Sequence, residues 1–183
     1  MPQGFALRQL LTSVAVVAVM VASHSAAASG KPRSPADQTA TVDSVVRATI
    51  DSKCHLTTYQ DPPVVTGTMV ELTVAFDNAS LRGFWAPDVA VQYGFDAAVR
   101  PLVRALFSDK AKRFKNINII RITLDIAPHD IPPTLVFEIS RAAWEAYHHD
   151  TGGISKVDFY KRIKITAGDK PFAFDPERAA DIE

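Results

Sequence analysis

Three neighbouring residues, His148, His149 and Asp150, carry side chains that bind metals or act as general bases. They lie in a segment with helical spacing, where neighbours point about 100° apart and ligands on one face must be three or four positions apart. A closed metal site would therefore need ligands from elsewhere in the fold. We interpret His148 and His149 as residues of the last helical turn, where imidazolium groups stabilise the helix end. Metal binding by the two histidines is the alternative.

The single cysteine, Cys54, raises the question of a reactive thiol. Its neighbour His55 points away from it on an extended chain, so His129 or His148 would have to approach through the fold. No glycine-rich turn or helix start flanks Cys54 to lower the pKa of its thiol. We expect an inert buried thiol or, in an oxidising compartment, an intermolecular disulfide. A reactive thiol at Cys54 is the alternative.

Two large aromatic residues, Phe84 and Trp85, lie in a loop bounded by Gly83 and Pro87. Aromatic side chains in such a loop either pack on the end of a sheet or anchor a protein contact. Packing on the core is the ordinary interpretation. Phe84 and Trp85 are nevertheless the candidate partner-binding residues, because aromatic anchors often dominate an interface.

The chain lacks the motifs of the common enzyme and cofactor classes. It contains no Gly-x-Gly-x-x-Gly, no phosphate loop, no Gly-x-Ser-x-Gly, no His-Glu-x-x-His and no Cys-x-x-Cys. We therefore expect no cofactor and favour a binding protein over an enzyme. The basic run at 110–115 follows a predicted helix end, where cations are stabilised, and is interpreted as solvent-exposed.

The first 28 residues have the three parts of a cleavable secretory signal peptide. Arg8 gives a positive start, Leu10–Ala22 is uncharged, and Ala26–Ala28 provides small residues for cleavage. The apolar stretch is shorter than the roughly 18 residues of a spanning helix, so no stable membrane span is expected after cleavage. The composition favours the periplasm, with secretion from the cell as the alternative.

The exported part of the chain is close to electrically neutral. Residues 1–28 contain Arg8 and no acidic residue, which leaves 19 Lys and Arg against 20 Asp and Glu. Nucleic acids and anionic membranes require a cationic excess or face, so no nucleic-acid partner is expected. A chain of this length can bury a core without a metal or a disulfide.

Composition divides the remaining chain into three parts. Residues 29–40 combine Gly, Pro, Ser and mixed charges without a bulky apolar side chain, which predicts a disordered tether. Residues 166–183 contain a glycine and two prolines and become acidic, which predicts a mostly disordered tail. Residues 41–165 form a single predicted domain.

Apolar residues alternate over three segments of this domain, 70–76, 120–126 and 135–139, which predicts strands. Residues 89–95 alternate in the same way and suggest a further strand. Three prolines between the last two strands predict a wide loop that joins an antiparallel pair.

Helical spacing of apolar residues predicts helices in the same domain. Residues 42–50 fit either a helix or a strand. Pro101 lacks an amide donor, so an irregular turn is expected over 97–100. The predicted helices are 99–107 with Asp96 as a cap, Ser140 to about Asp150, and Ser155 to about Ile165.

The order of these elements predicts an α+β fold, a small two-layer domain in which helices cover a mainly antiparallel sheet. The order leaves room for a parallel crossover only around the helix near 97–108. From these features we expect an exported, soluble domain that binds an envelope or secreted protein partner. A small metal-binding protein, or an enzyme that uses Cys54 and the histidines, is the alternative.

Overall fold

The computed structural model describes most of the chain after residue 34. The described ranges are 35–54, 57–59, 61–77, 86–108, 114–127, 134–148 and 153–182. The predicted signal peptide at 1–28 lies outside them. No helix within these ranges is long and apolar enough to cross a membrane.

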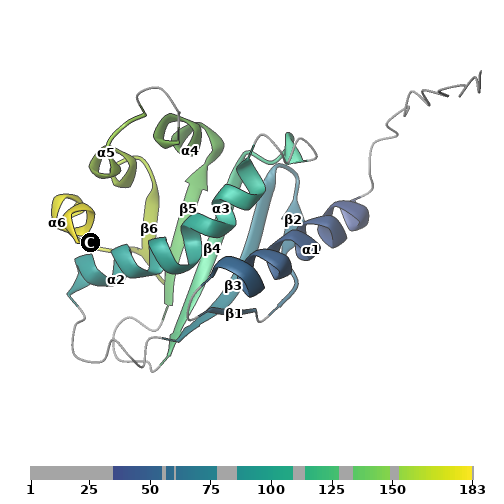
Figure 1. Cartoon of the computed structure of the whole chain (residues 1–183), viewed down its shortest axis with the longest axis horizontal. Coiled ribbons are helices and arrows are strands. Elements are labelled where there is room, and N and C mark those ends of the chain that lie inside the picture. The colour runs from purple at the N-terminus through teal and green to yellow at the C-terminus, as the bar shows by residue number, and fades with distance from the viewer. Residues whose placement is uncertain are drawn as a thin grey trace, which may run out of the picture. The chain divides into compact units, whose positions relative to one another are not determined.

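A mixed, open sheet of seven strands forms the centre of the domain (Figure 1). Its strands run in the order β1-β3-β4-β5-β6-β7, and β2 also pairs with β3. Every pairing is antiparallel except that of β3 with β4. The predicted α+β class and the antiparallel β4–β5 pair are thus confirmed. The strands are β1 (Thr57–Tyr59), β2 (Val64–Thr66), β3 (Met69–Asp77), β4 (Ile119–Ala127), β5 (Thr134–Ser140), β6 (Lys164–Ala167) and β7 (Lys170–Pro171).

One continuous helical segment connects the parallel strands β3 and β4. It comprises α2 (Pro87–Gly94), a π turn η2 (Phe95–Val99) and α3 (Arg100–Phe107). Parallel strands need such a crossover because a tight turn can join only antiparallel neighbours. The predicted helix at 99–107 and the predicted position of the crossover are confirmed.

The π turn lies directly before Pro101. The backbone N–H of Arg100 donates to the carbonyl of Phe95, five residues back, and Pro101 has no N–H to donate. One wider turn therefore lets the helical segment continue through the proline. Asp96 lies inside this segment, so its predicted role as a cap is wrong.

Residues 89–94 belong to α2 and Phe95 begins the π turn, so the strand suggested over 89–95 is wrong. The buried residues Ala90, Val91 and Gly94 recur at helical spacing, whereas Tyr93 is 39% exposed. A Cβ atom at Gly94 would lie 2.8 Å from Cδ1 of Leu124, so the glycine allows α2 to approach β4 closely. Apolar and polar residues alternate in this segment, but the segment forms a helix that packs tightly through the small residues Ala90 and Gly94.

The remaining helices complete one layer on the sheet. They are α1 (Pro35–Lys53), α4 (Arg141–Tyr147), α5 (Lys156–Tyr160) and α6 (Pro176–Asp181). Figure 1 shows α1, α2 and α3 lying across the strands. All six α-helices contribute to one apolar core, which also holds the buried side chains of β3, β4 and β5.

Serine caps begin two of these helices, as predicted. Ser140 Oγ accepts from the backbone N–H of Ala143 at 3.1 Å, and Ser155 Oγ accepts from that of Asp158 at 3.0 Å. Both helices end earlier than predicted. The helix α4 ends at Tyr147, and Ile165 belongs to strand β6.

The ordered structure extends past both predicted domain boundaries. The helix α1 begins at Pro35, inside the predicted tether, and residues 166–182 include the end of β6, β7 and α6. The predicted disordered tail is wrong because this segment has specific anchors. The backbone N–H of Asp175 donates to Asp88 Oδ1 at 2.7 Å, Phe174 packs edge-on against Tyr160, and Ala179 is fully buried.

Candidate functional site

The face of the sheet opposite the helices carries a row of alternating charges across four strands. Strand register places Glu71, Arg121, Glu138 and Lys164 side by side on β3, β4, β5 and β6. We call these four residues the charged row. Neighbouring strands lie about 4.8 Å apart, so each side chain faces an opposite charge.

Arg121 is the centre of the charged row. Its Nη1 lies 2.5 Å from Glu71 Oε1, and its Nε and Nη2 lie 3.0 and 2.5 Å from Glu138 Oε2. The pKa of Arg121 is raised, chiefly by its hydrogen bonds to Glu138 and to a lesser extent by its hydrogen bond to Glu71. The guanidinium is thus held in one geometry and its charge is balanced within the sheet.

An uncharged row lies next to the charged one. Thr73, Thr123, Val136 and Thr166 occupy matched positions on the same four strands, and we call them the threonine row. Thr166 is only 8% exposed. These short, β-branched side chains are stiff and leave this part of the face without a long charged group.

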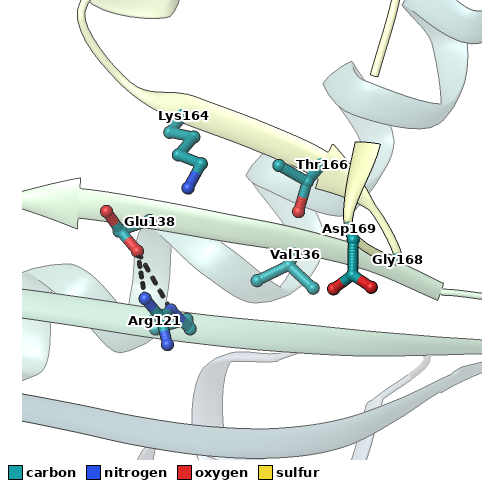
Figure 2. Close-up of a pocket in the computed structure, with 7 residues that line it drawn as sticks. All are labelled: Arg121, Val136, Glu138, Lys164, Thr166, Gly168 and Asp169. Atoms are coloured by element: carbon teal, nitrogen blue, oxygen red, sulfur yellow. Dashed lines mark hydrogen bonds and ion pairs between the residues drawn. The ribbon is translucent and has the colours of Figure 1, made fainter. Parts of the chain in front are cut away.

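A hollow of about 260 Å³ lies over the ends of the two rows at β6. Figure 2 shows Lys164 and Asp169 at opposite ends of it, with Thr166 and Val136 between them. Gly168, with φ +58°, allows the tight turn that brings Asp169 to the rim. Within the described ranges, Lys164 and Asp169 have no ion pair or side-chain hydrogen bond, so their charges are available to an incoming molecule.

Cys54 lies apart from this face, at the end of α1. It is half-buried, and its Sγ lies 3.9 Å from the carbonyl oxygen of Ala98 in the π turn. Burial raises the pKa of the thiol to about 11. The thiol is therefore protonated at neutral pH, and reactivity at Cys54 stays a prediction without an activating group among its described contacts.

His148 is the residue that caps the carboxyl end of α4. It is exposed, its ring lies 5.2 Å from that of Trp144, and its backbone N–H donates to the Trp144 carbonyl. Among the described residues, no group of three or more His, Cys, Asp and Glu could hold a metal ion. Metal binding at His148 thus remains a hypothesis with no partner ligand shown.

The other predicted site residues lie outside the described ranges. These are Phe84, Trp85 and His149, together with His55 and His129. The interpretation of Phe84 and Trp85 as partner-binding residues stays a prediction.

Sequence reasoning missed the two rows on the sheet. The alternation in β4 and β5 does place Arg121 and Glu138 on the polar face of each strand. Their pairing, however, depends on the register between strands, and Lys164 was assigned to a helix. No protein-family model, curated protein or solved structure matches the chain.

Proposed function

We propose that this chain is an exported, non-enzymatic binding module and that a protein partner sits on the face formed by the charged and threonine rows. The threonine row carries the proposal, because it is an uncharged strip on a face that no described helix covers. The compartment we propose is the periplasm, on the basis of the signal peptide predicted at 1–28. Secretion from the cell is the alternative.

The distribution of side chains on this face supports the proposal of a protein interface. Interface centres are depleted in charged residues and surrounded by a polar rim. Here the threonine row is the centre, while Lys164 and Asp169 form part of the rim (Figure 2). Val64, which is 56% exposed, lies beside Glu71 at the β2 end of the charged row.

The ion pairs of Arg121 pre-organise part of this face. Arg121 already has two carboxylate partners, so its side chain is held in place before a partner binds. Pre-organised groups lose little conformational entropy on binding. The partner we propose therefore presents an uncharged strip to the threonine row, a carboxylate to Lys164 and a cation to Asp169.

Site-specific photo-crosslinking in the native host tests this proposal. A photoreactive amino acid replaces Val136 in the threonine row, or Ala142 on the exposed side of α4 as a control. We expect an adduct from position 136 and not from 142, formed by a chain that has lost residues 1–28. Adding Lys164→Glu should reduce the adduct several-fold, because the rim attraction becomes a repulsion.

The matched control is Lys170→Glu. Lys170 is an exposed lysine on the adjacent strand β7, and its partner Ala167 is in register on the opposite side of β6 from Thr166. This variant should leave the adduct unchanged. Equal adducts from positions 136 and 142, or equal losses with the two lysine variants, would overturn the proposal.

A further inference from the structure

A second hollow of about 420 Å³ lies between α3 and α4, on the helical side of the domain. Arg100 and Arg104 line it from α3, and Trp144, Tyr147 and His148 line it from α4. We call it the α3–α4 groove. Its size is within the range of small-molecule sites, about 300 to 1,000 Å³. It shares no lining residue with the face proposed to bind a protein.

Arg100 and Arg104 line the groove from the same helix, α3. They are four positions apart on α3 and therefore lie on the same side of the helix. Both residues are exposed. Two adjacent guanidinium forks match the oxygen atoms of a carboxylate or a phosphate.

Arg100 is oriented by the π turn. Its Nη1 lies 3.2 Å from Oδ1 of Asp96, a residue of that turn. Oδ2 of Asp96 accepts from Lys156 Nζ at 3.0 Å and from the side-chain amide of Gln92. The amide oxygen of Gln92 in turn accepts from the buried hydroxyl of Tyr160 at 3.0 Å. These hydrogen bonds extend into the core and hold Asp96 in place.

The groove retains a cationic excess. One carboxylate, Asp96, serves both Arg100 and Lys156. Arg104 takes part in no ion pair among the described residues. On α4, the carboxylate of Glu145 faces Arg141 at 3.7 Å. The charges of the described residues therefore leave Arg104 unbalanced, and Arg100 is balanced only by a carboxylate that it shares with Lys156.

The floor of the groove is aromatic and rigid. Trp144 is 2% exposed, and the ring of Tyr147 stacks on that of Phe159 at 4.5 Å. The rings of Trp144 and Tyr147 meet edge to face at 5.9 Å. The aromatic surface open to a ligand is therefore that of Tyr147 and of the exposed His148, whose ring lies 5.2 Å from that of Trp144.

We propose that the α3–α4 groove binds an aromatic oxyanion, whose ring packs against Tyr147 and His148, next to the buried Trp144, and whose carboxylate or phosphate is held by Arg100 and Arg104. The two head groups share one chemistry, namely negative oxygen atoms that accept from guanidinium forks. The ring and the head group are each needed. A ring alone leaves the arginines hydrated, and a head group alone makes no contact with the floor.

Fluorescence titration of Trp144 tests this binding. The full chain with Trp85→Phe has Trp144 as its one tryptophan. We expect saturable changes with the probes phenyl phosphate and benzoate, which separate the phosphate from the carboxylate source. Benzyl alcohol and inorganic phosphate, each carrying one half of the ligand, should bind at least about tenfold more weakly.

Substitution of Arg104, with a control on α1, tests whether an arginine of the groove binds the head group. Arg104→Gln should weaken binding of the better probe about tenfold, since a charge-assisted contact is lost. Arg47→Gln is the control for the loss of one positive charge, because Arg47 is also an exposed arginine of a helix but lies on α1, outside the groove. It should leave the affinity unchanged. Unchanged urea midpoints for both variants would show that folding is intact.

Two results would overturn the proposal. One is equal binding of benzyl alcohol and the charged probes, which would mean that the groove has apolar contact only. The other is an equal effect of Arg104→Gln and Arg47→Gln, which would mean a general effect of charge. The crosslinking at Val136 does not depend on either result.

Discussion

Cys54 is a thiol whose ionisation is controlled by burial. It follows α1 and lies against the π turn, where its Sγ approaches the Ala98 carbonyl. Burial favours the neutral thiol over the thiolate and so raises the pKa to about 11. This environment comes from residues more than 40 positions away in sequence, which is why the flanking residues alone did not reveal it.

The raised pKa predicts a loss of stability at high pH. The folded chain binds the thiol proton more tightly than the unfolded chain, whose cysteine titrates near 9. This stabilisation is complete below about pH 9 and is lost as the pH rises through about 11. We expect the urea midpoint of the natural chain to fall over this range more steeply than that of Cys54→Ala.

The comparison between these two proteins isolates the thiol. The pKa of Tyr59 is also raised, chiefly by burial, and this tyrosine is present in both chains. Its contribution therefore cancels in the difference. Parallel pH dependences for the natural chain and Cys54→Ala would contradict the prediction.

Residue types alone identified part of the groove. His148 was singled out for its chemistry. Arg100 and Arg104 gave no signal, because two arginines on the polar side of an amphipathic helix have the pattern of a solvated face. Their role depends on α4 packing beside α3, which is a tertiary contact.

At the scale of elements, the caps are the features that local sequence determined best. Ser140 links the end of β5 to α4, and its Oγ satisfies an N–H of the first helical turn. Ser140→Ala should therefore reduce the free energy of unfolding by about 1 kcal/mol. Urea denaturation followed by circular dichroism measures it.

Ser52→Ala provides the control for this substitution. The hydroxyl of Ser52 donates to the carbonyl of Ala48 within α1, on the exposed side. Alanine is a better helix former than serine, so this change should be neutral or slightly stabilising. If both variants lose the same stability, the cap at Ser140 is not the cause.

Long elements with a clear period could be predicted, and short or exceptional ones could not. The strands β3, β4 and β5 and the helix α3 each bury one regular face. By contrast, β6 and β7 contain four and two residues, too few to show a period. The helix α2 was missed because its contact with β4 depends on Gly94, which contributes no side chain to a hydrophobic pattern.

At the scale of the whole molecule, the carboxyl-terminal segment is part of the fold. Asp88 of α2 is 6% exposed, and its carboxylate accepts from the Asp175 backbone and lies 3.4 Å from Arg178 Nε. Deleting residues 175–183 leaves this carboxylate without either partner. We expect the free energy of unfolding to fall by about 1 to 3 kcal/mol, measured by urea denaturation.

Glu177→Gln separates this effect from a general change in charge. Glu177 is exposed and lies 3.9 Å from the exposed Lys161. Pairs of this kind contribute little, so the variant should have the stability of the natural chain. A deletion as stable as Glu177→Gln would show that the segment is dispensable.

The two carboxylates on Arg121 lie at very different distances along the chain. Glu138 is 17 positions away, in the neighbouring β5, whereas Glu71 is 50 positions away, across the whole crossover. Closing a long loop costs more entropy than closing a short one, and distant pairings slow folding. We expect the β4–β5 hairpin to form first and β3 to join it last. If the chain is exported amino terminus first, β3 would then leave the cytoplasm before β4, the strand with which it pairs. Their paired residues Glu71 and Arg121 are 50 positions apart.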